Sequence, residues 1–148
     1  MNMTNAQQAL QTAGLAFLGI GAWFDLRKRA LPSVYLAAVF ILGGVLAVFL
    51  REGFPWPCLF SVLPGLFLLS LVPATRGGIG AGDGLLMLAV GTVLPVEEVL
   101  GALIIGFFLA SFYAGSLLLR RRGRNTAFPL VPFLHLGYLA LLFSEHLA

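Results

Sequence analysis

The sequence predicts an all-α polytopic membrane protein with six transmembrane helices. Its 148 residues are 59% hydrophobic with a mean hydropathy of +0.98, and only 10% are charged, against about 25% in ordinary soluble domains. The apolar residues form long continuous runs, whereas the strands of a membrane barrel alternate apolar and polar positions. The basic residues gather in short segments between these runs, as they do in the loops of membrane proteins.

A helix needs about 20 mostly apolar residues to cross a bilayer, and six segments approach this length. The predicted spans are 7–26, 32–50, 57–74, 83–95, 96–119 and 127–147. The fourth, DGLLMLAVGTVLP, is short. The first has no basic leading segment and no small-residue cleavage site, so we interpret it as a retained span and not as a signal peptide. We therefore expect a single membrane-embedded domain over residues 1–148.

The basic residues predict how the spans are oriented. Eight of the nine Lys and Arg residues fall between spans one and two, three and four, or five and six, and only Arg51 falls on the other side. Because basic loops stay in the cytoplasm, these three connections are predicted to be cytoplasmic and both termini to lie outside. The expected location is the inner (cytoplasmic) membrane. Charge confined to loops is unlike the basic face of a nucleic-acid binder, so no nucleic-acid partner is expected.

Asp25 and Asp83 are the only two aspartates of the chain. Asp25 ends the first span and Asp83, in the stretch GGIGAGDG, opens the fourth, so the predicted topology puts both at the cytoplasmic edge of the membrane. Two carboxylates that meet in a partly dry site share one proton, and one acts as a base toward water while the other acts as an acid toward a carbonyl. This is the chemistry of aspartic proteases. Gly80 and Gly82, which lack side chains, would let a peptide substrate approach the carboxylate.

Each of these residues also has a purely structural interpretation. Asp25 can pair with Arg29 one helical turn further along, and Asp83 can be the N-cap of its helix. The glycines can form a turn or allow helices to pack closely. A nucleotide-binding GxGxxG site is disfavoured, because that motif requires a preceding strand. The arrival of two lone aspartates at the same membrane face favours the joint, catalytic interpretation.

These residues resemble a known family, the type IV prepilin peptidases, which are membrane aspartic proteases of the GxGD type. Asp83 lies in GAGD, where Gly80 and Gly82 match the two glycines of the motif. Asp25 lies in DLRKRALPS, which is similar to the family's first-aspartate segment of Asp, basic residues and Ile-Pro-Asn. The segment FPLVPFLHLGY resembles the start of the family's last span. Leu85 departs from the pattern, since Lys often stands two residues after the GxGD aspartate.

The resemblance implies that Asp25 and Asp83 are the catalytic pair. It implies a prepilin-like membrane protein as substrate, cut at the cytoplasmic face just before its hydrophobic helix, and it implies no metal or organic cofactor. Long members of the family carry a cysteine cluster and methylate their product. This chain has one cysteine, Cys58, and resembles the short, peptidase-only forms of Tad/Flp pilus systems and archaeal preflagellin peptidases.

Other classes of function fit the sequence less well. His135 and His146 lack the spacing of a metalloprotease motif, and YAGSLLLR lacks the second glycine of a GxSxG serine motif. A non-enzymatic assembly factor or a small proton-coupled transporter subunit stays open as an alternative, because an acid pair in a membrane also suits proton transport. A transporter would carry polar residues near the bilayer midplane, where these spans are almost wholly apolar. Glu97 and Glu98 are interpreted as solvated charges that start the fifth span.

Overall fold

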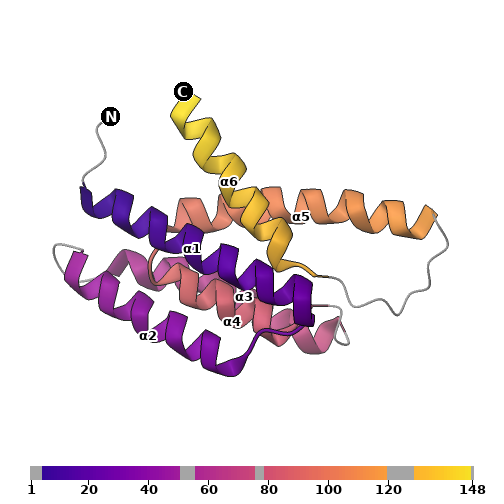
Figure 1. Cartoon of the computed structure of the whole chain (residues 1–148), viewed down its shortest axis with the longest axis horizontal. Coiled ribbons are helices and arrows are strands. Elements are labelled where there is room, and N and C mark those ends of the chain that lie inside the picture. The colour runs from indigo at the N-terminus through magenta and orange to yellow at the C-terminus, as the bar shows by residue number, and fades with distance from the viewer. Residues whose placement is uncertain (1–4, 51–55, 76–78, 120–128, 148) are drawn as a thin grey trace.

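The computed structural model of the protein describes residues 5–50, 56–75, 79–119 and 129–147. Within these ranges the chain forms six α-helices and no strand (Figure 1). The helices are α1 (Asn5–Lys28), α2 (Ser33–Leu50), α3 (Trp56–Ala74), α4 (Ala81–Gly91), α5 (Val96–Leu119) and α6 (Val131–Leu147). The predicted all-α class is therefore confirmed, and each helix overlaps one of the six predicted spans.

Three of the helices, α1, α2 and α5, are long and apolar enough to cross a membrane. The apolar parts of α3 and α6 are shorter, and α4 has only 11 residues. At 1.5 Å per residue α4 is roughly 16 Å long, about half of a hydrocarbon core of some 30 Å. The apolar helices, with many large hydrophobic side chains exposed, are those of a membrane protein. The six-span topology with outward termini stays a prediction.

The predicted fourth span, 83–95, is helical over only part of its length. Helix α4 begins two residues earlier and ends at Gly91. The N–H groups of Thr92, Val93 and Leu94 then donate to carbonyls in the last turn of α4 at 3.1, 3.0 and 3.0 Å. Val93 and Leu94 are fully buried, so this turn lies inside the protein, where non-helical backbone is tolerated in a membrane protein.

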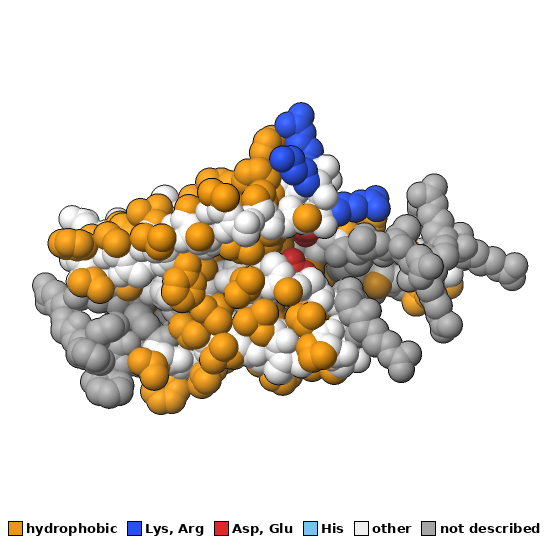
Figure 2. All heavy atoms as spheres, turned by 90° about the horizontal axis from the view of Figure 1, so that it is seen from below, with side chains coloured by type: hydrophobic (Ala, Val, Ile, Leu, Met, Phe, Trp, Pro, Cys, Tyr) orange, Lys and Arg blue, Asp and Glu red, His pale blue; other side chains and the backbone are white. Residues whose placement is uncertain are grey.

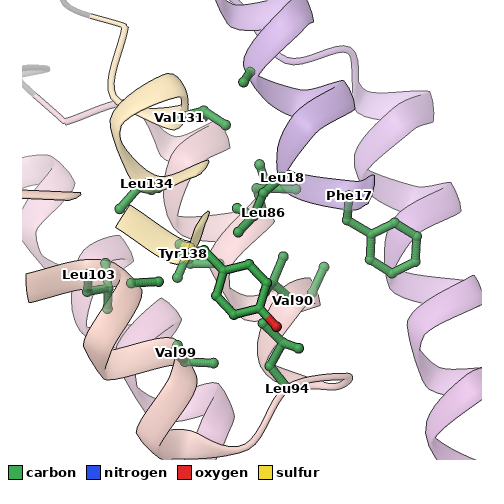
Figure 3. Close-up of a cluster of buried hydrophobic side chains, with 14 of the residues drawn as sticks. Phe17, Leu18, Leu86, Val90, Leu94, Val99, Leu103, Val131, Leu134 and Tyr138 are labelled. Atoms are coloured by element: carbon green, nitrogen blue, oxygen red, sulfur yellow. The ribbon is translucent and has the colours of Figure 1, made fainter. Parts of the chain in front are cut away.

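Helix α4 is the centre of the bundle. It packs against α1, α2, α3 and α5, and several of its side chains, Leu86 and Val90 among them, have no exposed surface. Figure 3 shows Leu86 and Val90 of α4 in one buried cluster with Leu18 of α1 and Tyr138 of α6. Because α4 is enclosed in this way, the position of Asp83 near its start is set by the packing of the whole bundle.

Glycines allow two helix pairs to approach until their backbones touch. A Cβ at Gly137 of α6 would lie 2.6 Å from the carbonyl oxygen of Ala102 and 2.7 Å from the amide nitrogen of Gly106, both on α5. A Cβ at Gly91 of α4 would lie 2.2 Å from the carbonyl oxygen of Ser61 on α3. Membrane bundles use small residues at such contacts, because van der Waals packing contributes most where lipid removes the hydrophobic driving force.

We expect Gly137→Ala to lower the melting temperature of the detergent-solubilised protein by several degrees. The added methyl group overlaps the backbone of α5, which cannot move aside as a flexible side chain can. Gly115→Ala is the matched control, because a Cβ at this position of α5 meets nothing within 4 Å. Thermal unfolding followed by circular dichroism measures both variants, and equal melting temperatures would contradict the close α5–α6 contact.

Candidate active site

The fold brings the two aspartates together. Asp25 lies in the last turn of α1 and Asp83 in the first turn of α4. Although 58 positions separate them in the sequence, their carboxylates are within range of mutual electrostatic repulsion. Both side chains are buried, at 7% and 8% exposed. The structure therefore places Asp25 and Asp83 at the same end of the bundle, as the predicted topology required. The catalytic role of the pair stays a prediction.

The acid pair is flanked by the basic end of α1. The described Lys and Arg residues are Arg27, Lys28 and Arg29, and all three are exposed. Figure 2 shows these basic side chains beside acidic side-chain atoms recessed among hydrophobic side chains and backbone. The guanidinium of Arg27 lies 5.0 Å from the ring centroid of the half-exposed Trp23, a cation–π contact. Tryptophan with adjacent basic residues is typical of the membrane–water interface.

Asp83 is the third residue of α4 and not its N-cap. The N-cap is Gly80, whose backbone N–H donates to Oδ2 of Asp83 at 3.3 Å. This is the acidic half of a capping box, in which a first-turn carboxylate accepts the N–H of the N-cap residue. The interpretation of Asp83 as the N-cap is therefore wrong, because the N-cap is three residues earlier. The charge still lies at the positive end of the helix dipole, and Oδ1 accepts no hydrogen bond from a described residue.

Asp25 is held by a different helix. Its Oδ2 accepts the backbone N–H of Val131, the first residue of α6, at 3.2 Å and across 106 positions of sequence. The carboxylate thus satisfies one of the N–H groups that every helix start leaves without an internal partner. In the described part of the chain Asp25 forms no ion pair with Arg29, so the interpretation in which these two residues pair is wrong. Arg29 instead ends α1 in a left-handed conformation, φ 50°, with its N–H bonded to the Asp25 carbonyl at 2.9 Å.

The two glycines before Asp83 have close neighbours of their own. A Cβ at Gly82 would lie 3.3 Å from Leu31, in the connection between α1 and α2, so packing accounts for glycine at this position. A Cβ at Gly80 would lie 3.2 Å from Oδ2 of Asp83. Gly80 is exposed and Gly82 is half-buried, so Gly80 is the more accessible of the two to a substrate backbone. Their contact with substrate stays a prediction.

Leu85, the position at which the family often has Lys, faces away from the acid pair. It is 43% exposed, whereas Asp83 is 8% exposed. Residues two apart on a helix point to different sides, which explains the contrast. Leu85 is therefore on the exposed side of α4, while the Asp83 carboxylate is on the buried side.

A third buried carboxylate lies on α5, where the sequence indicated a solvated charge. Glu98 is 9% exposed, and it accepts hydrogen bonds of 2.7 Å from Nε2 of Gln11 on α1 and from the hydroxyl of Tyr138 on α6. The interpretation of Glu98 as solvated is wrong, while Glu97 is exposed as expected. Gln11 is 14 residues before Asp25 on α1, so the two acidic sites are roughly 20 Å apart along that helix. The sequence feature that could have indicated a buried Glu98 is Gln11, because a polar residue inside an apolar span favours a hydrogen-bond partner on a neighbouring helix.

We expect Glu98→Ala to destabilise the bundle by about 1–3 kcal/mol, because it leaves the buried amide of Gln11 and hydroxyl of Tyr138 without an acceptor. Glu98→Gln has nearly the same shape and keeps an acceptor oxygen, so it should lose less. Glu97→Ala, at the exposed neighbour, is the control. Unfolding in detergent is the measurement, and wild-type stability of Glu98→Ala would mean that the buried network contributes nothing.

The described residues contain no group of three His, Cys, Asp or Glu side chains that could hold a metal ion. His135 lies on α6 beside Gly19 of α1, with a buried Nδ1 that has no hydrogen-bond partner in the part of the chain that the structure describes. Among the described residues, the buried ionisable groups where α1 meets α4 are the carboxylates of Asp25 and Asp83.

A buried pair of carboxylates at helix ends, inside an apolar helical bundle, defines a membrane protein with a candidate aspartic dyad. Residues 12–115 match the type IV leader peptidase family, and this match includes both Asp25 and Asp83. The chain belongs to this family, which confirms the resemblance seen in the sequence and makes the protein a protease of the prepilin leader peptidase type. The segment FPLVPFLHLGY lies beyond the matched residues. Comparisons with curated proteins and with solved structures gave no significant match.

Proposed function

We propose that the protein is a membrane aspartic endopeptidase that removes the leader peptide from type IV prepilin-like substrates at the cytoplasmic face of the inner membrane. The observation that carries this proposal is the proximity of Asp25 and Asp83, the only aspartates of a chain in the leader peptidase family. Each is buried and each accepts a backbone N–H, so neither is a mobile surface charge.

In the proposed reaction the two carboxylates hold one proton between them. The ionised carboxylate takes a proton from water while the water oxygen bonds to the scissile carbonyl carbon, and the protonated carboxyl gives its proton to the carbonyl oxygen. The tetrahedral diol then breaks its C–N bond: the carboxyl that took the proton from water gives it to the amine nitrogen, and the other carboxylate takes a proton back from a diol hydroxyl. One water is consumed, the leader keeps the new carboxyl group, and the pair again holds one proton.

The proposed substrate is a membrane protein with a polar leader followed by an apolar helix. That helix would lie in the bilayer beside the enzyme and present the leader junction at the level of the aspartates. Support for the cytoplasmic side comes from the basic residues Arg27, Lys28 and Arg29, which lie at the same end of α1 as Asp25. We expect no methyltransferase activity and no cofactor requirement, as in short members of the family.

The direct test is co-expression with a prepilin-like substrate, followed by N-terminal sequencing of the product. The wild-type chain should yield a substrate that begins at the junction between leader and apolar helix. Asp25→Asn and Asp83→Asn should each abolish cleavage, because an amide can replace neither the general base nor the general acid.

Glu97→Gln is the control for these variants, since it also removes one acidic charge but at an exposed position of α5. It should process substrate as the wild type does. Size-exclusion profiles and melting temperatures in detergent should show that both Asn variants stay folded. Normal processing by the two Asn variants would rule out the dyad.

The orientation is tested by thiol labelling. With Cys58 changed to Ser, single cysteines are placed at Lys28, at the end of α1, and at Ser144, near the end of α6; both positions are exposed. A membrane-impermeant maleimide should label residue 144 in intact cells, after permeabilisation of any outer membrane, and residue 28 only after cell lysis. The opposite pattern would put the aspartates on the outer side.

A further inference from the structure

The acid pair is formed by α1 and α4, but a third helix reaches it. We propose that the backbone N–H of Val131, the first residue of α6, positions the Asp25 carboxylate for catalysis, so that the start of α6 is a working part of the active site. This inference rests on the proposed peptidase function and adds a positioning residue to it. It concerns a region outside residues 12–115, the part matched by the family.

The first observation is the hydrogen bond itself. It joins a carboxylate that is 7% exposed to a residue with no exposed surface, at 3.2 Å. Hydrogen bonds to a charged acceptor are stronger than neutral ones, and low local dielectric strengthens them further. Among the described residues Val131 is the only donor to the Asp25 side chain. Without this N–H, no described hydrogen-bond donor would fix the orientation of the Asp25 side chain.

The second observation is that the donor is held rigidly. Leu130 and Val131 are buried, and the carbonyl of Leu130 accepts two N–H groups of the first turn of α6. Gly21, one turn before Asp25 on α1, is the contact point, because a Cβ there would lie 3.4 Å from Cγ1 of Val131 and 2.7 Å from Cδ2 of Leu86. Helices α1, α4 and α6 therefore come together one turn before Asp25, and this packing holds the Val131 N–H beside the carboxylate.

The third observation is that the two carboxylates are held in the same way. Asp83 accepts the N–H of Gly80 at the start of α4, and Asp25 accepts the N–H of Val131 at the start of α6. Two positive helix ends thus converge on the acid pair and offset part of the repulsion between its charges. Each carboxylate uses Oδ2 for this contact, and Oδ1 of each accepts no hydrogen bond from a described residue.

The test is Val131→Pro, which removes the N–H and little else. Proline is well tolerated at the first position of a helix, and Leu130 before it is not helical, as a residue preceding proline should be. The assay uses purified protein in detergent and a peptide with a polar leader ahead of about 20 apolar residues. We expect kcat to fall roughly tenfold or more, with KM within about twofold of wild type, because the substrate contacts are unchanged.

Two further variants separate the N–H from other effects. Val131→Ala keeps the N–H and should recover kcat to within about threefold of wild type, a margin for its lost packing. Val96→Pro is the matched control. Val96 is the first residue of α5 and adjoins Pro95, as Val131 is the first residue of α6 and adjoins Pro132. Val96 lies at the other acidic site, two residues before Glu98, and not at the aspartates. This control should cleave as the wild type does.

The inference is overturned if folded Val131→Pro keeps the wild-type kcat, or if Val131→Ala loses as much activity as Val131→Pro. If Val131→Pro does not fold, the α-hydroxy analogue of valine at position 131, which replaces only the N–H by oxygen, decides in its place. Failure of the wild-type protein to cleave any leader peptide would instead refute the proposed function, so the two failures are distinguishable.

Discussion

Two acidic side chains are buried in an apolar helical bundle within range of mutual repulsion, and the packing of the helices has to offset the cost. Removal from water and mutual repulsion both oppose such a pair. The protein meets this cost with two helix starts, α4 beneath Asp83 and α6 beside Asp25, each of which contributes a backbone N–H and the positive end of its dipole. Both helix starts must therefore be held in place by packing.

The bundle holds these helix starts in place by close packing between helices and by a few buried hydrogen bonds. Helix α4 is enclosed on several sides, and glycines let α3 approach α4 and α5 approach α6 until their backbones touch. Helices α1 and α6 are joined at two places, by the Asp25–Val131 hydrogen bond and through Glu98 of α5, which bonds both Gln11 and Tyr138. In a bilayer, lipid competes for apolar contacts, so close packing of small residues and buried hydrogen bonds hold the helices together.

This arrangement bears on how the site would work. Oδ2 of each carboxylate accepts a backbone N–H, and in the proposed reaction the Oδ1 atoms would act on water and substrate. The family match ends at residue 115, before α6 begins, although α6 provides the group that holds Asp25. The proposed site thus extends beyond residues 12–115, the part of the chain that matches the family.

The sequence by itself determined the helical class, the approximate bounds of the six helices and the two aspartates, with GAGD as the more specific signal. These features are local, because hydropathy and span length can be read from consecutive residues. Even the meeting of Asp25 and Asp83 followed from span order and loop charge. The tertiary structure alone decided that the N–H of Val131 bonds the Asp25 carboxylate and that Glu98 is buried. These contacts join residues as many as 106 positions apart, and they depend on the crossing and register of helices, which an apolar run does not encode.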